Sequence, residues 1–209
     1  RQGEAWTPRQ RRKNLLLRAL VRGLVAVAAR LPAAILGPVG AALGALAWRG
    51  VPALRRDARR TLAAAYPEAS PAERDERGRA ALVHMGRILA ETLTLLGGRT
   101  LPPLPADLAA LDDAVAEGRG VVLPSAHLGP WERVAATLAA RYEGFVAVGR
   151  ESYDPALTSL YTRTRSALGV RCIFRGAPGS GAAMLRALRG AGVLGVPMDL
   201  RSRVPSLRV

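Results

Sequence analysis

From residue 119 onward, short apolar runs alternate with longer helical patterns, and this alternation constrains the fold more than any other feature of the sequence. The expected strands are 120–123, 145–148, 171–174 and 193–198, and the expected helices between them are 131–141, 155–168 and 180–189. Strands that alternate with helices of this length form a mostly parallel sheet with right-handed crossovers. The C-terminal part is therefore predicted to be α/β, with helices flanking the sheet.

The preceding part of the chain predicts helices. We expect a basic tail and membrane-associated helices over 1–48, a helical region and connector over 49–118, and the α/β core over 119–209. Residues 31–48 contain no charged side chain, and their length is near that needed to cross a bilayer. Because Pro38 and several glycines interrupt them, a helical hairpin lying in one leaflet fits the pattern at least as well.

Two local patterns in the N-terminal half are more specific. Residues 1–14 are polar and basic, which predicts a flexible tail or an anchor for lipid headgroups. Ser70 and Glu73 have the spacing of a capping box, with Pro71 at the first helical position. The helix that they open is expected to stop at Gly97.

Composition limits the partners of the chain. A net charge of +15 suits an acidic partner, which is nucleic acid, anionic lipid or an acidic carrier protein. Aromatic residues are only 4% of the chain and form no stacking pattern on the expected strands, so nucleic acid is not expected. Cys172 is the single cysteine, which excludes an internal disulfide. No cluster has the spacing of metal ligands, and we predict neither a metal nor a cofactor.

His127 and Glu132 carry the clearest catalytic pattern. His127 follows the first expected strand and Glu132 lies in the first turn of the next helix, at the sheet edge where ligands of α/β proteins bind. A histidine can take a proton from an alcohol near neutral pH, and a carboxylate on its other ring nitrogen fixes the tautomer. The turn at Gly129 and Pro130 could fold Glu132 back toward His127. The alternative is a polar loop histidine and a glutamate that favours a helix N-terminus.

Other polar residues follow the later strands at the same edge. Arg150 and Glu151 close the second strand, and Asp199 ends the last full strand. The planar fork of an arginine grips phosphate or carboxylate at two points, although a solvated pair of Arg150 and Glu151 explains the residue types equally well. Asp199 could orient an arginine or help hold the acceptor.

The glycine-rich loop at 176–181 precedes the last expected helix. It lacks the lysine that follows the last glycine in a Walker A phosphate-binding loop. Ser180 is expected to cap the helix, and an anion at this helix N-terminus remains a second interpretation.

Several of these segments resemble one enzyme family. Residues 127–132, His-Leu-Gly-Pro-Trp-Glu, resemble the His-x4-Asp/Glu signature of the glycerolipid acyltransferase superfamily. The Gly and Trp within them resemble the branch of the bacterial lipid A biosynthesis (lauroyl/myristoyl) acyltransferases and their relatives that acylate phosphatidylinositol mannosides. Residues 59–70 resemble the Asn-Leu-x-x-x-Phe-Pro-Glu segment of that branch, with Thr61 in place of the usual Asn. Arg150, Arg165 and the strand ending in Asp199 resemble further blocks.

The resemblance implies a fold and an activity. The fold would be glycerolipid-acyltransferase-like, with the anchoring helices at the N-terminus and further residues beyond Val209. His127 and Glu132 would form a dyad that activates an acceptor hydroxyl toward an acyl thioester. Because no residue is well placed as a nucleophile, attack on the thioester is expected to be direct. Arg150, with Glu151, Arg165 and Asp199, would bind the anionic substrate.

The resemblance also implies partners and a location. The donor would be acyl carrier protein or acyl-CoA, and the acceptor a hydroxyl of an anionic glycolipid such as a lipid A precursor. The enzyme would lie at the bacterial inner membrane, with its catalytic part on the cytoplasmic side. Two alternatives remain: acyl-CoA-dependent acylation of a phospholipid or mannosylated lipid, and a basic membrane- or nucleic-acid-binding protein in which His127 and Glu132 are incidental.

Overall fold

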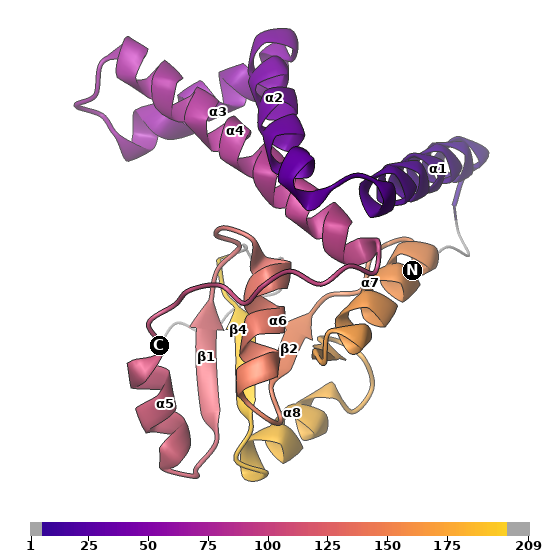
Figure 1. Cartoon of the computed structure of the whole chain (residues 1–209), viewed down its shortest axis with the longest axis vertical. Helices are drawn as coiled ribbons and strands as arrows, with labels where there is room; N and C mark the ends of the chain where they lie inside the picture. The colour runs from indigo at the N-terminus through magenta and orange to yellow at the C-terminus, as the bar shows by residue number, and fades with distance from the viewer. Residues whose placement is uncertain (1–5, 200–209) are drawn as a thin grey trace. The chain divides into compact units, whose positions relative to one another are not determined.

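The computed structural model describes residues 6–199 and divides the chain into two compact units (Figure 1). The helical unit is Ala19–Leu101, and the sheet unit combines residues up to Arg18 with those from Pro102 onward. The first helices are α1 Pro8–Arg30, α2 Ala33–Gly50, α3 Pro52–Ala65, α4 Pro71–Leu96 and α5 Ala109–Ala116. The remaining elements are β1 Val121–Ser125, α6 Trp131–Arg141, β2 Val146–Gly149, α7 Pro155–Ala167, β3 Arg171–Phe174, α8 Ser180–Arg189 and β4 Val193–Pro197.

The four strands form one sheet in the order β1-β4-β2-β3, and every pair in it is parallel. Figure 1 shows β4 between β1 and β2, although it is the last strand in the sequence. The predicted α/β class, with a parallel sheet flanked by helices, is confirmed. Because all strands point the same way, their carboxyl ends meet at one edge of the sheet.

Alternate residues of the strands pack against helices on opposite faces of the sheet. Phe145 and Val193 pack with Leu138 of α6 and Leu111 of α5. Their neighbours in the sequence pack on the other face, where Val146, Val148 and Leu194 meet residues of α8. This alternation is typical of strands that are buried on both faces. The sheet therefore lies between two layers of helices.

The helical unit is held together by close contact between α2 and α4. A Cβ atom at Gly40 would overlap the carbonyl oxygen of Gly86, and one at Gly44 would overlap that of Leu82. Glycine at these positions therefore lets the two helix backbones approach more closely than any side chain would allow. The indole of Trp48 covers Gly78 in the same way, because a Cβ there would lie 2.7 Å from the ring.

Local sequence patterns in the helical unit have mixed outcomes. The capping box is confirmed, since the Ser70 hydroxyl accepts from the Glu73 N–H and the Ser70 N–H donates to the Glu73 carboxylate at 2.7 Å. The helix ends at Gly97, as predicted. The expected flexible tail over 1–14 is wrong from Pro8 onward, where α1 begins, because arginine, lysine and glutamine are good helix formers.

The expected interruption of residues 31–48 is also only partly right. Pro32 precedes α2, but α2 continues through Pro38. No single helix among residues 6–199 is both long and apolar enough to cross a bilayer. The consecutive segments Ala34–Gly50 and Pro52–Ala65 reach that length and hydropathy only together, and they are bent by 90° at the break between them.

The α2–α4 contact predicts a strong difference between two glycines of one helix. Gly40→Ala places a methyl group against the Gly86 carbonyl and should lower the free energy of unfolding by about 1–3 kcal/mol. Gly37→Ala is the matched control, because nothing lies within 4 Å of its Cβ position and alanine favours a helix by about 0.8 kcal/mol. Urea unfolding followed by circular dichroism measures both, and equal stability of the two variants would contradict the close contact.

Candidate active site

The carboxyl edge of the sheet brings together most of the residues predicted from the sequence. Ser125 pairs with Pro197 in register, so His127 and Asp199 each lie two residues beyond the ends of neighbouring strands. Arg150 follows β2, the strand on the other side of β4. Glu132 lies in the first turn of α6, directly after the loop that carries His127.

His127 and Asp199 form the central contact of this edge. One oxygen of the Asp199 carboxylate lies 2.9 Å from the His127 Nδ1, and the other accepts the His127 backbone N–H at 2.9 Å. Two hydrogen bonds hold the pKa of Asp199 below its usual range: the larger contribution comes from the His127 imidazole and the smaller from the His127 backbone N–H. Because an ionised carboxylate only accepts hydrogen bonds, Nδ1 carries a proton, and in the neutral imidazole the lone pair is then on Nε2.

The imidazole of His127 is accessible to a substrate. Its side chain is 38% exposed, and the edge of the Trp131 ring lies near it, with 5.8 Å between ring centroids. Among the described residues, Nε2 has no hydrogen-bond partner. This nitrogen can therefore accept a proton from a hydroxyl group that approaches the sheet edge.

Glu132 has a different partner from the one expected. Both of its carboxylate oxygens accept from the Arg165 guanidinium, at 2.9 Å from Nε and 2.6 Å from Nη2. Glu132 is only 6% exposed, and the hydrogen bonds with it raise the pKa of Arg165, so the guanidinium stays charged. The carboxylate on the His127 ring is therefore Asp199, and the Glu132 carboxylate is held by α7.

Arg150 and Glu151 do not form the ion pair that the residue types allowed. The Arg150 guanidinium lies over the Tyr153 ring at 4.5 Å from its centroid and has no carboxylate partner among residues 6–199. It is exposed, whereas Glu151 is partly buried. Stacking on a tyrosine restrains the guanidinium while its N–H groups remain available to an anion.

The loop before α8 differs from its prediction in one detail. The residue that caps α8 is Gly179, with φ of 75°, so Ser180 is the first residue of the helix and its side chain makes no capping hydrogen bond. Glycine adopts this left-handed conformation without the steric cost of a Cβ atom, which explains its place at the cap. The residues that close the chain, 206–209, which would lead into a further strand, lie outside the described residues.

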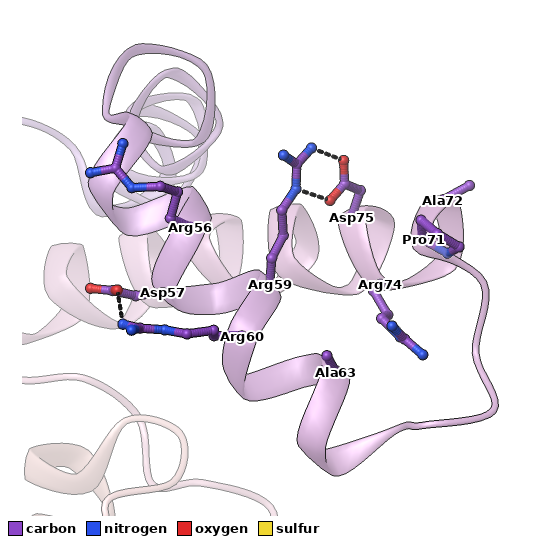
Figure 2. A pocket seen from close by; sticks show the side chains of 9 residues that line it. All are labelled: Arg56, Asp57, Arg59, Arg60, Ala63, Pro71, Ala72, Arg74 and Asp75. Carbon is purple, nitrogen blue, oxygen red and sulfur yellow. Dashed lines mark hydrogen bonds and ion pairs between the residues drawn. The ribbon is translucent and has the colours of Figure 1, made fainter.

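A separate pocket of about 1000 Å³ lies in the helical unit, between α3 and the start of α4. Figure 2 shows the arginine side chains that line it, with the Arg59 guanidinium facing the Asp75 carboxylate. Arg60 is paired with Asp57, while Arg56 has no such partner within residues 6–199. None of the predicted site residues lines this pocket, which makes it a basic surface feature and not part of the candidate active site.

The sheet edge has the features of an enzyme that activates a hydroxyl group. A histidine whose Nδ1 is held by an ionised carboxylate, with Nε2 without a partner among the described residues, is an arrangement suited to a general base. The family model described as bacterial lipid A biosynthesis acyltransferase matches residues 7–196. The chain belongs to this family and is an acyltransferase that acts on lipid. No curated protein matches the chain.

The buried pair of Glu132 and Arg165 predicts a stability effect that is separate from catalysis. Glu132→Gln leaves the Arg165 charge without a carboxylate and should cost about 3 kcal/mol in urea unfolding. The double variant Glu132→Gln with Arg165→Met removes both charges and should recover most of that loss. Glu117→Gln is the control, because the pair of Glu117 and Arg119 is exposed and its loss should change stability little. A double variant no more stable than Glu132→Gln would contradict this account.

Proposed function

We propose that the protein moves a fatty acyl group from an acyl thioester, most naturally acyl carrier protein, to a hydroxyl of an anionic glycolipid such as a lipid A precursor. The observation that carries the proposal is the pair of His127 and Asp199 at the sheet edge, in a chain of this family. The net charge of +15 supports both an acidic carrier protein and an acidic lipid as partners.

In the proposed reaction His127 is the general base. Its Nε2 takes the proton of the acceptor hydroxyl as the oxygen attacks the thioester carbonyl, and a carbon–oxygen bond forms. When the tetrahedral intermediate collapses, the carbon–sulfur bond breaks and the leaving thiolate receives the proton from the imidazolium. Asp199 keeps the proton on Nδ1 and stabilises the imidazolium between these steps.

The remaining site residues have supporting roles in this proposal. Arg150 binds a phosphate of the acceptor, because its guanidinium is exposed and has no carboxylate partner in the described chain. Glu132 and Arg165 are positioning residues, since their two-point contact fixes the start of α6, which follows the His127 loop, against α7. Cys172 lies within β3, away from the carboxyl edge, and its Sγ accepts from Arg165 Nη1 at 3.7 Å. In this proposal the acceptor therefore attacks the thioester directly and no acyl-enzyme forms.

We also propose that the helical unit attaches the enzyme to one leaflet of the inner membrane, on the cytoplasmic side. Four exposed apolar residues form one stripe along α2, opposite its glycine face: Ile35, Val39, Leu43 and Leu46. The chain then bends by 90° and continues as α3. This helix carries four arginines and lines the basic pocket of Figure 2. An apolar helix followed by a basic amphipathic one suits insertion of α2 and contact of α3 with anionic headgroups.

The mechanism predicts unequal effects of the two histidines. In transfer of a labelled acyl group from acyl carrier protein to a phosphorylated lipid A precursor, His127→Ala should lower kcat by at least about 1000-fold. Asp199→Asn should lower it by about 100- to 10,000-fold, because the ring loses its tautomer and its counter-charge. His84→Ala is the control, since His84 lies on α4 in the helical unit and should leave the rate unchanged.

A competition assay with the wild-type enzyme separates the two candidate donors. Acyl-CoA should compete poorly with acyl carrier protein if the carrier protein is the donor. Undiminished transfer by His127→Ala would overturn the proposed base.

The membrane proposal predicts a change in vesicle binding. Leu43→Asp places a charge in the apolar stripe and should weaken co-sedimentation with phosphatidylethanolamine/phosphatidylglycerol vesicles by about 10- to 100-fold, the value of one buried leucine. Leu185→Asp, at an equally exposed leucine on α8, should have no such effect. Equal binding by both variants would exclude α2 as the inserted element.

A further inference from the structure

Two arginines lie side by side where β2 and β3 end. Gly149 and Phe174 are the last paired residues of these strands, and the backbone N–H of Arg175 donates to the Gly149 carbonyl at 2.9 Å. This hydrogen bond belongs to the last pair of the parallel ladder, so Arg150 and Arg175 each directly follow the end of neighbouring strands. Their backbones are therefore about one strand spacing apart, roughly 4.8 Å.

Neither guanidinium is neutralised by the rest of the described chain. Both side chains are exposed, and no carboxylate in residues 6–199 pairs with either of them. The Arg150 guanidinium is restrained above the Tyr153 ring, at 4.5 Å from its centroid. Two adjacent cations repel each other in water, and an anion bound between them reverses the sign of that interaction.

The helix that follows Arg175 adds to the positive potential. In a parallel α/β fold the crossover helices start at the carboxyl edge of the sheet, and α8 starts at Ser180, five residues after Arg175. Its first turn contains no acidic residue and its cap is Gly179, whereas the N-terminus of α7 is already occupied by the Asp154 carboxylate. The N–H groups at the start of α8 therefore support binding of an anion at this corner.

We propose that Arg175 and Arg150 form a clamp for a phosphate group of the acceptor lipid, with Arg175 as a specificity-determining residue. This inference rests on the proposed function and deepens it. In the strand order β1-β4-β2-β3, Arg150 follows the second strand from β1 and Arg175 the third, about 10 and 14 Å from the strand that precedes His127. The clamp therefore selects an acceptor whose phosphate lies on the order of 10 Å from the reacting hydroxyl, as in a large glycolipid and not in glycerol phosphate.

The test compares one lipid with and without its phosphates. With a phosphorylated lipid A precursor, Arg175→Ala should raise KM by about 10- to 100-fold and leave kcat within a few-fold, because a charged hydrogen-bonding pair is lost from binding alone. With the same lipid after phosphatase treatment, wild type and Arg175→Ala should have equal KM values. Arg175→Lys should recover only part of the affinity, since an ammonium group lacks the planar fork.

Arg171→Ala is the matched control. Arg171 is an exposed arginine on the same strand, but at its opposite end, and its loss should leave KM unchanged with both lipids. An equal rise of KM for both lipids in Arg175→Ala would show a structural role, and an unchanged KM would show no role. Either result overturns the clamp.

A binding measurement separates this inference from the proposed function. If wild type transfers no acyl group to any lipid, the proposed function fails, and equilibrium binding of the two lipids in mixed micelles still tests the clamp. Tighter binding of the phosphorylated lipid by wild type, lost in Arg175→Ala, supports it. Equal binding of both lipids by wild type overturns it.

Discussion

The hydrogen bonds between His127 and Asp199 are the contacts on which the site depends. These residues are 72 positions apart in the chain, and they meet because β4 inserts next to β1 in the sheet. One carboxylate accepts from both the ring and the backbone of His127, so it fixes the position of the loop and the tautomer together. Any shift in the register of β1 and β4 would break both contacts at once.

The buried ion pair explains why the sequence motif contains a glutamate that does not reach the histidine. Glu132 lies in the first turn of α6 and is buried, and a lone charge at such a position would be costly. Arg165 satisfies both of its oxygens, and the pair joins the helix after β1 to the helix after β2. In this arrangement Asp199 contacts the His127 ring. Glu132 instead fixes the start of the helix that follows the His127 loop, through its contact with Arg165.

The local elements of the sheet unit could be predicted closely, but their neighbours could not. The bounds of α6, β3 and α8 agree with the apolar periodicity, because each element is short and bounded by turn residues. The strand order depends on which way each crossover runs, and no local pattern contains that information. For this reason Asp199 was predicted at the edge without its contact to His127, and Arg175, which belongs to no motif, was not predicted at all.

The strand order also explains how one edge can serve two opposite electrostatic needs. A base that becomes cationic during the reaction is stabilised by a carboxylate and opposed by a nearby guanidinium. The order β1-β4-β2-β3 places the Asp199 strand directly beside the His127 strand and puts the strand before Arg150 on the far side of it. The negative charge of Asp199 thus lies between the imidazole and the cationic end of the sheet. In the proposed reaction, a phosphate bound at that end would neutralise the arginines, and the imidazolium would form beside its own carboxylate without an uncompensated cation near it.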